Sequence, residues 1–135
     1  MEKKKITSYN DLDVYQRAYK SCLVVMQKII PKLPVSEKYD LANQLSRSCK
    51  AVPRLIAEGF AKKHQRAGFQ KYIDDAMAES NESQVSICQC RDLYSNMVDI
   101  VICEELIKEY EIIGKQLYKL GEAWSKFTKA PNTSI

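Results

Sequence analysis

Apolar residues recur at alternating spacings of three and four along four stretches of the chain, which is the pattern of amphipathic α-helices. On the first stretch, the expected apolar face is formed by Leu12, Tyr15, Tyr19, Cys22, Met26 and Ile29. The segment PKLP, residues 31–34, comes next, and its prolines predict the end of the first helix.

The second stretch has a proline in the middle of its helical pattern. Ser36 is a suitable N-cap for this helix. Its apolar positions are Leu41, Leu45, Cys49, Val52, Ile56 and Phe60. Pro53 lacks a backbone donor, so either the helix bends there, or it ends and a new helix starts with proline in its first turn. Because the apolar spacing keeps its phase across Pro53, we expect one continuous, kinked helix that ends near Gly59 and the polar residues 62–68.

Two further helices are expected in the second half of the chain. The third is predicted from about Arg66 to Tyr94, and the fourth from about Cys103 to Phe127. The apolar face of the third consists of Phe69, Ile73, Ala76, Ile87, Cys90 and Tyr94, and that of the fourth of Leu106, Ile113, Leu117, Leu120 and Trp124. Residues 128–135 are predicted to be a disordered tail.

Four amphipathic helices with short connections predict an all-α fold. Short loops force sequential helices to be neighbours, so we expect an antiparallel up-down-up-down four-helix bundle over residues 1–127. A helical-hairpin repeat is the lesser alternative. At 135 residues, the chain has the size of one domain with its own core.

The composition adds limits on the class of protein. With 45% hydrophobic and 28% charged residues, the chain is typical of globular rather than disordered proteins. No run of apolar residues is long enough for a membrane span, and we expect a cytoplasmic protein. Five cysteines scattered over helical segments indicate reduced thiols rather than a disulfide framework. The net charge of +4 permits an anionic partner.

Candidate chemistry for an enzyme is sparse. His64 is the only histidine, and Cys88 and Cys90 would point about 200° apart on a helix, which does not suit a shared metal ion. No phosphate-binding loop or dinucleotide motif is present. We therefore predict no catalytic residues, no metal site and no cofactor, and a non-enzymatic protein.

Positive charge is concentrated between residues 47 and 71, where Glu58 is nearly the only opposing charge before the third helix. The candidate nucleic-acid contacts are Arg47, Lys50, Arg54, Lys62, Lys63, Arg66 and Lys71. Arg47, Lys50 and Arg54 would lie within about 60° of one another, opposite the apolar face. We call these three residues the basic row. Without interleaved aromatic residues, contact with phosphates rather than bases is expected, and a merely solvated helix face is the alternative.

A polar run, ESNESQ at residues 79–84, interrupts the third helix. Ser80 and Ser83 continue its apolar face, so small residues are expected where the helices approach closely. We predict a structural polar network in which Asn81 and Glu82 meet Glu58 at a buried or interfacial contact, with Arg17 or Gln44 as alternative partners. An acid–base pair is the lesser alternative.

Three sets of residues, in this order and spacing, carry a resemblance to a known family. They are Tyr9, Asp11, Leu12, Tyr15, Gln16, Arg17 and Ala18, then Gln44, Leu45, Val52, Pro53, Ile56, Ala57, Glu58 and Gly59, and then Phe69, Tyr72, Ile73, Ala76, Asn81 and Glu82. The chain resembles the bacterial four-helix-bundle proteins encoded by intervening sequences of large-subunit ribosomal RNA genes. The same family includes the accessory variability determinant (Avd) proteins of diversity-generating retroelements. This chain departs from the family pattern at Leu55, Ala78 and Glu79, where members often carry Asn and a Gly-Ser pair.

The resemblance implies a function and an assembly. It implies a bundle that forms a ring-shaped homopentamer with a nucleic-acid-associated role. Our main expectation is an Avd-like accessory scaffold that binds a reverse transcriptase and its template RNA or cDNA. The alternatives are a ribosomal RNA intervening-sequence protein, or a protein-binding or self-assembling bundle without direct RNA contact. In an oligomer, the acidic residues Asp74, Asp75, Glu79 and Glu82 could meet the basic row of a neighbouring subunit.

Overall fold

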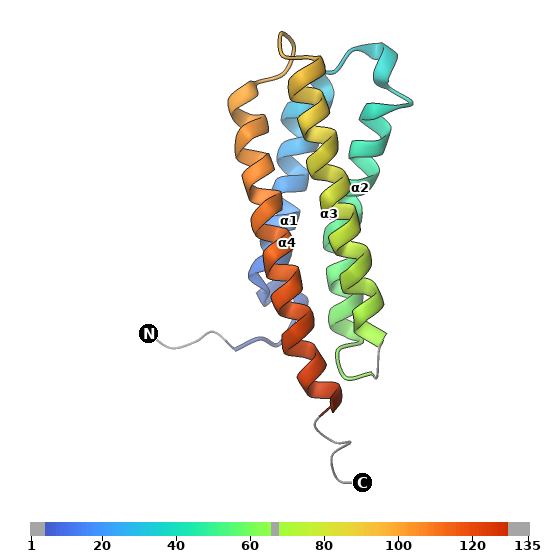
Figure 1. Cartoon of the computed structure of the whole chain (residues 1–135), viewed down its shortest axis with the longest axis vertical. Coiled ribbons are helices and arrows are strands. Elements are labelled where there is room, and N and C mark those ends of the chain that lie inside the picture. The colour runs from blue at the N-terminus through green and yellow to red at the C-terminus, as the bar shows by residue number, and fades with distance from the viewer. Residues whose placement is uncertain (1–4, 66–67, 130–135) are drawn as a thin grey trace.

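The computed structural model describes residues 5–65 and 68–129, and every regular element in these ranges is helical (Figure 1). The four long helices are α1 (Asp13–Val24), α2 (Leu41–Ala61), α3 (Gly68–Leu93) and α4 (Ile100–Lys129). Short helical turns flank α1, at Tyr9–Asp11 before it and at Val25–Ile29, Ile30–Lys32 and Val35–Glu37 after it. The predicted all-α class is confirmed for the described residues.

Consecutive long helices α2, α3 and α4 run in opposite directions (Figure 1). A Cβ at Gly59, late in α2, would lie 3.3 Å from Cβ of Tyr72, early in α3. Ser48, earlier in α2, bonds Ser83, later in α3. Contacting residue numbers therefore rise in one helix as they fall in the next, which is the relation expected across short connections.

The buried face of α1 differs from the predicted one. Leu12 and Ile29 are buried as expected, but Tyr15, Cys22 and Met26 are only half-buried, and Tyr19 is 49% exposed. The residues that pack inward are Val14, Ala18, Ser21, Val25 and Ile29. Small side chains allow α1 to approach its neighbours closely, so the larger tyrosines lie at the edge of the helix, where their rings pack on one another.

The connection between α1 and α2 differs from the prediction at the N-cap of α2. The first helix ends, as predicted, in the proline segment, through a π-helical segment and a 3-10 turn. Ser36 lies inside the 3-10 turn Val35–Glu37 and is not the N-cap, so that prediction is wrong. Instead, Glu37 Oε1 accepts a hydrogen bond of 3.2 Å from the backbone N–H of Leu41. A carboxylate near a helix N-terminus also opposes the positive end of the helix dipole.

The second helix continues through Pro53, which confirms the continuous helix. The proline is buried in it, and the predicted bend there stays a prediction. The fourth helix begins at Ile100, three residues earlier than expected, because Asp99 caps it. Asp99 Oδ1 accepts hydrogen bonds from the backbone N–H groups of Val101, at 2.9 Å, and Ile102, at 3.3 Å. The helix ends at Lys129, so it enters the segment predicted as a tail, and residues 130–135 lie outside the described residues.

The core agrees with the predicted faces of α2, α3 and α4. Its largest fully buried side chains include Tyr110, Phe69, Leu45, Ile56, Ile73, Ile87, Ile113 and Leu117. Of the predicted positions, Phe60, Tyr94 and Leu120 are only half-buried. In the part of the chain that the structure describes, no helix is long and apolar enough to cross a bilayer.

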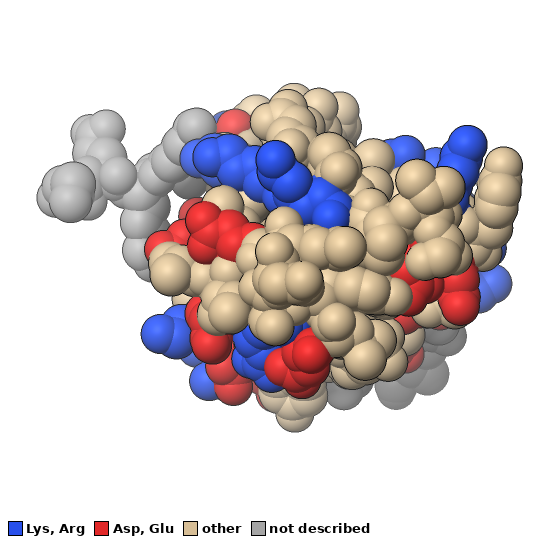
Figure 2. Space-filling view, turned by 90° about the horizontal axis from the view of Figure 1, so that it is seen from above, with Lys and Arg blue, Asp and Glu red and all other residues tan. Residues whose placement is uncertain are grey.

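The two ends of the bundle are packed differently. At the end formed by the α2–α3 connection, the Trp124 ring packs edge-on against Phe60 and Phe69, with ring centroids 6.1 and 5.7 Å apart. At the opposite end, Val35 and Tyr39 are 88% and 85% exposed. Figure 2 views the molecule from this second end and shows uncharged residues across its centre, with charged residues toward the rim. Only the first end is closed by aromatic packing.

Two glycines inside helices provide a matched test of this packing. A Cβ at Gly114 would meet no atom within 4 Å, so Gly114→Ala should raise the free energy of unfolding by about 0.5–1 kcal/mol through helix propensity. Gly59 lies against Tyr72 and Trp124, so Gly59→Val should lower it by about 1–3 kcal/mol through overpacking. Urea unfolding followed by circular dichroism measures both. Equal effects of the two substitutions would contradict the close approach of α2 to α3.

Candidate nucleic-acid interface

The basic row lies on the outer face of α2. Arg47, Lys50 and Arg54 are all exposed, whereas Cys49 and Val52, which alternate with them along the helix, are fully buried. Because the buried residues fix how α2 is rotated against the bundle, the three cations must point into solvent. The sequence-predicted orientation of the basic row is therefore present in the structure.

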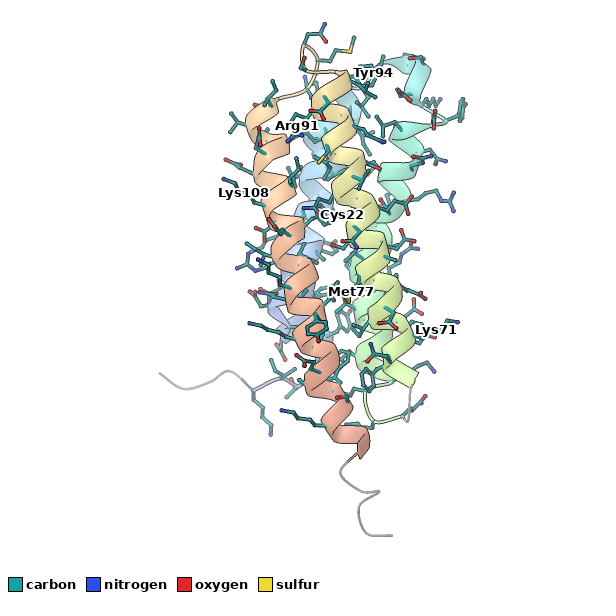
Figure 3. The ribbon with its side chains drawn as sticks, viewed as in Figure 1. Cys22, Lys71, Met77, Arg91, Tyr94 and Lys108 are labelled. Carbon is teal, nitrogen blue, oxygen red and sulfur yellow. The ribbon has the colours of Figure 1, made fainter. Side chains whose placement is uncertain are left out.

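The other predicted basic residues are spread toward the end of the bundle where α2 meets α3. Lys62 and Lys63 follow α2, and the ammonium of Lys63 lies 3.7 Å from the centroid of the Phe60 ring. Lys71 is exposed on the first turns of α3 and points away from the bundle (Figure 3). Arg66 lies outside the described residues. The predicted cations thus occupy the α2 surface and its adjoining end rather than one compact cluster.

The described cations of this surface have no carboxylate partner among the residues that the structure covers. No Asp or Glu oxygen lies within 4.0 Å of the charged nitrogens of Arg47, Lys50, Arg54, Lys62, Lys63 or Lys71. The one side-chain hydrogen bond in the basic row runs from Arg54 Nε to the backbone oxygen of Lys50, at 3.4 Å. Most of the donors of these side chains therefore remain available to a ligand.

The carboxylates of Asp75, Glu79 and Glu82 on α3 form an acidic edge beside the basic row of the same chain. Arg54 and Glu58 of α2 line a shallow hollow of about 340 Å³ together with Asp75 and Glu79 of α3. A neighbouring hollow of about 260 Å³ is lined by Arg47, Arg54, Glu79 and Glu82, among others. Burial raises the pKa of Glu79, and the nearby Glu82 carboxylate adds to this effect, while Arg47 opposes it. The α2–α3 groove therefore combines both signs of charge.

The predicted polar network of Glu58, Asn81 and Glu82 is not formed within the chain. All three side chains are exposed, and no hydrogen bond joins Glu58 to the other two in the described structure. The reason lies in the helical rotation of the run at residues 79–84. Its serines, Ser80 and Ser83, turn inward, so Asn81 and Glu82 must face solvent.

The buried polar contacts belong to smaller side chains at the middle of the bundle. Ser83 Oγ donates a hydrogen bond of 2.8 Å to Ser48 Oγ, and Ser80 Oγ lies 3.5 Å from the backbone oxygen of Tyr110. These contacts link α3 to both α2 and α4. The prediction that Ser80 and Ser83 continue the apolar face is confirmed, since they are 1% and 0% exposed.

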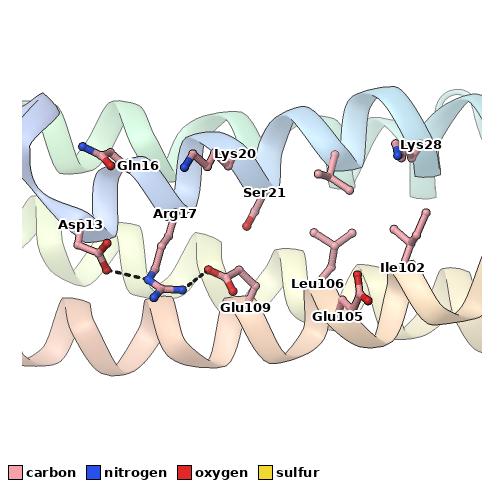
Figure 4. A pocket seen from close by; sticks show the side chains of 11 residues that line it. Asp13, Gln16, Arg17, Lys20, Ser21, Lys28, Ile102, Glu105, Leu106 and Glu109 are labelled. Atoms are coloured by element: carbon pink, nitrogen blue, oxygen red, sulfur yellow. Dashed lines mark hydrogen bonds and ion pairs between the residues drawn. The ribbon is translucent and has the colours of Figure 1, made fainter.

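A second groove, between α1 and α4, has a volume of about 490 Å³ (Figure 4). Arg17 spans it, with Nε 2.7 Å from Asp13 Oδ2 and Nη1 2.6 Å from Glu109 Oε1. The hydrogen bond from Arg17 lowers the pKa of Asp13, and a second one from Gln116 adds to this. The sequence does not show that Arg17 meets Glu109, because these residues are 92 positions apart. The four-residue spacing of Asp13 and Arg17, in contrast, is that of an ion pair on one helix face. Arg17 is already paired with two carboxylates here, so it offers an anion less than the cations of the basic row do.

No cluster of three or more His, Cys, Asp or Glu side chains that could hold a metal ion occurs among the described residues. The exposed cations of α2, which have no carboxylate partner among the described residues, therefore remain the candidate interface.

Comparison with known families decides which kind of bundle this is. The family model of the 23S rRNA-intervening sequence proteins matches residues 10–119, which include all four helices in whole or in large part. The chain belongs to this family. No curated protein and no solved structure matches the chain.

The family match supports one of the functions expected from the sequence more than the others. It agrees with the intervening-sequence alternative, and the expected Avd-like role has no support from it. The three positions that depart from the pattern attributed to the intervening-sequence proteins, Leu55, Ala78 and Glu79, all line the larger α2–α3 hollow.

The raised pKa of Glu79 leads to a pH-dependent prediction. A carboxyl whose pKa is higher in the folded than in the unfolded protein contributes stability at low pH, and this contribution is lost as the pH rises through the folded-state pKa. Glu79→Gln, which stays neutral, should therefore raise the melting temperature near pH 7 and have little effect near pH 4. Thermal unfolding at both pH values measures this. Glu111→Gln, on an exposed position of α4, is the matched control, and an equal gain from the control would contradict the prediction.

Proposed function

We propose that this member of the 23S rRNA-intervening sequence protein family is a non-enzymatic, RNA-associated helical bundle that contacts phosphates through its basic row. The observation that carries the proposal is the set of three exposed cations, Arg47, Lys50 and Arg54, which have no carboxylate partner among the described residues. The description of the family, 23S rRNA-intervening sequence protein, supports RNA as the class of nucleic acid to test.

The geometry of the basic row suits a backbone contact. Its residues span seven positions of one helix, or about 10 Å along the axis, and their long side chains extend into solvent. Such contacts release counterions from the nucleic acid, so affinity depends strongly on salt and weakly on sequence. No aromatic residue lies between Arg47 and Arg54 to stack on bases. Recognition by backbone and shape is the expected mode.

The acidic edge sets a limit on this contact. Glu79 and Glu82 line the same hollow as Arg47, so they reduce the positive potential on that side of the basic row. Lys50 lines neither of the two hollows. We therefore expect a nucleic acid to approach α2 from the side away from α3.

The protein partners and the assembly are also proposals. A ring-shaped homopentamer in the cytoplasm is the expected form, and a reverse transcriptase is a partner only in the retroelement role, which the family match does not favour. In an alternative use of the basic row, which would compete with RNA, Asp74 and Asp75 of one subunit would oppose the basic row of the next subunit in the ring. Both carboxylates are exposed on α3 and can serve such a head-to-tail contact, which closes into a ring when the rotation between subunits allows it.

RNA binding through the basic row can be tested by fluorescence anisotropy. A structured RNA is titrated with the protein at several salt concentrations, and again with Arg47, Lys50 and Arg54 all changed to Ala. Removing three phosphate contacts should weaken binding and lower the slope of log affinity against log salt by about 2–3. The matched control changes Lys108, Lys115 and Lys119 to Ala, which removes the same charge from exposed positions of α4.

The two triple variants separate the possible outcomes. A smaller slope in the α2 variant alone supports the proposal. Equal losses in both variants would mean that only net charge matters, and absence of binding at low salt would leave a bundle that binds proteins only. Circular dichroism of both variants should be unchanged, because all six residues are exposed.

Oligomerisation can be tested independently by light scattering coupled to size-exclusion chromatography. The expected mass is about five times the 15.5 kDa of the chain. Changing Asp74 and Asp75 to Lys should lower this mass, because like charges would then face each other across the contact. A monomeric mass of the unchanged protein at micromolar concentration would refute the ring.

A further inference from the structure

Two cysteines from different helices meet inside the bundle. Cys22 on α1 and Cys49 on α2 are 27 positions apart in the chain, yet their Sγ atoms lie 3.6 Å apart. Figure 3 places Cys22 near the middle of the bundle, away from both ends. All five cysteines are free thiols, and this pair is the one for which the structure records a sulfur–sulfur contact.

The two thiols differ in access. Cys22 is half-buried, whereas Cys49 is fully buried. Among the remaining cysteines, Cys88 is half-buried, and Cys90 and Cys103 are buried. The Cys22–Cys49 pair therefore combines an accessible sulfur with a protected one.

The pKa values of the two thiols are also shifted in opposite directions. A hydrogen bond from the Cys49 thiol lowers the pKa of Cys22 to about 7, and the positive charges of Lys50 and Arg54 contribute. The same contact and burial raise the pKa of Cys49, so its thiol keeps the proton. Burial raises the pKa of Cys90 to about 12, which leaves it unreactive. The thiolate needed for attack is thus available at the accessible position of the pair.

The backbone next to the pair departs from a regular α-helix. The π-helical segment Val25–Ile29 begins three residues after Cys22. Such segments are rare and are frequently found at functional sites. Closing a disulfide requires the two sulfurs, now 3.6 Å apart, to approach to about 2.05 Å.

We propose that Cys22 and Cys49 form a peroxide-reactive dithiol that closes into a reversible disulfide between α1 and α2. The Cys22 thiolate attacks one oxygen of hydrogen peroxide, the O–O bond breaks, and hydroxide leaves as the cysteine becomes a sulfenic acid. Once Cys22 is a neutral sulfenic acid, the hydrogen bond to its thiolate and the charge of that thiolate no longer hold the proton on Cys49. The Cys49 sulfur then loses its proton and attacks the Cys22 sulfur, the S–O bond breaks, and the leaving hydroxide takes up that proton as water. In total, two thiols lose two electrons and one peroxide is reduced to two waters.

The disulfide would change how α1 is held. It would close a loop that contains the whole connection between α1 and α2, and so restrict the unfolded chain. Reduction by a dithiol would restore the open form. The modification is independent of RNA binding, so it can be present whether or not the proposed function is correct.

Peptide mapping of the full chain tests the proposal directly. The protein is treated with a stoichiometric amount of hydrogen peroxide, its remaining thiols are alkylated under denaturing conditions, and it is digested with trypsin. Cys22 and Cys49 then lie on the separate peptides 21–28 and 48–50, apart from the peptides that carry Cys88, Cys90 and Cys103. We expect a linked pair of these two peptides, loss of two of the five alkylatable thiols, and a monomeric band on a non-reducing gel. Dithiothreitol should reverse all three.

Two single substitutions show whether the link depends on Cys22 in particular. Cys22→Ser should abolish the linked pair and leave four alkylatable thiols, whereas Cys88→Ser, at an equally half-buried position, should leave the link intact. Peptide mapping of the unchanged protein does not depend on these variants, so its result stands even if a variant is destabilised. The proposal is overturned if all five thiols stay alkylatable, if Cys22 proceeds to sulfinic acid while Cys49 remains free, or if the links join other cysteines or other chains.

Discussion

The arrangement of this bundle depends on the burial of serine hydroxyls at its centre. A buried hydroxyl is costly unless it is hydrogen-bonded, and Ser83 meets this requirement through Ser48 while Ser80 faces the Tyr110 backbone oxygen. Sliding α3 by one turn along α2 or α4 would separate these groups. The contacts are small enough to let the helices approach closely, so they fix both the spacing and the register of three helices. The same register decides which residues of α2 and α3 face each other at the surface.

Register at the core therefore determines charge at the surface. With Ser48 and Ser83 paired, Arg47 lies across a groove from Glu79 and Glu82, and the basic row is positive mainly on its outer side. The net charge of +4 does not reveal this asymmetry, because it counts the basic row and its acidic edge together. The chain belongs to the intervening-sequence family, and its own residues decide which side of α2 carries the positive charge.

The sequence predicted most of the fold and less of the surface. The faces of α2, α3 and α4 could be read from spacing because large apolar side chains dominate them, and the phase across Pro53 identified one helix. On α1, tyrosines suggested the wrong face, because close packing there selects small residues such as Ala18. Spacing also placed Ser80 and Ser83 on the inward face of α3, but the network predicted for Glu58, Asn81 and Glu82 ignored that the same rotation turns Asn81 and Glu82 toward solvent. The bridge from Arg17 to Glu109 joins segments that only the folded chain brings together. The α2 cap depended on Glu37, a residue of the loop rather than of the helix.

The unequal packing of the two ends implies a gradient of local stability along the bundle. Aromatic rings of Phe60, Phe69 and Trp124 hold three helices together at one end, whereas Val35 and Tyr39 are left in solvent at the other. Backbone hydrogen bonds with few buried side chains around them open at a lower free energy than those in the core. Amide protons should therefore exchange fastest around the α1–α2 connection and slowest toward the tryptophan. The bundle would begin to unfold from its exposed end while its aromatic end still held α2, α3 and α4 in place.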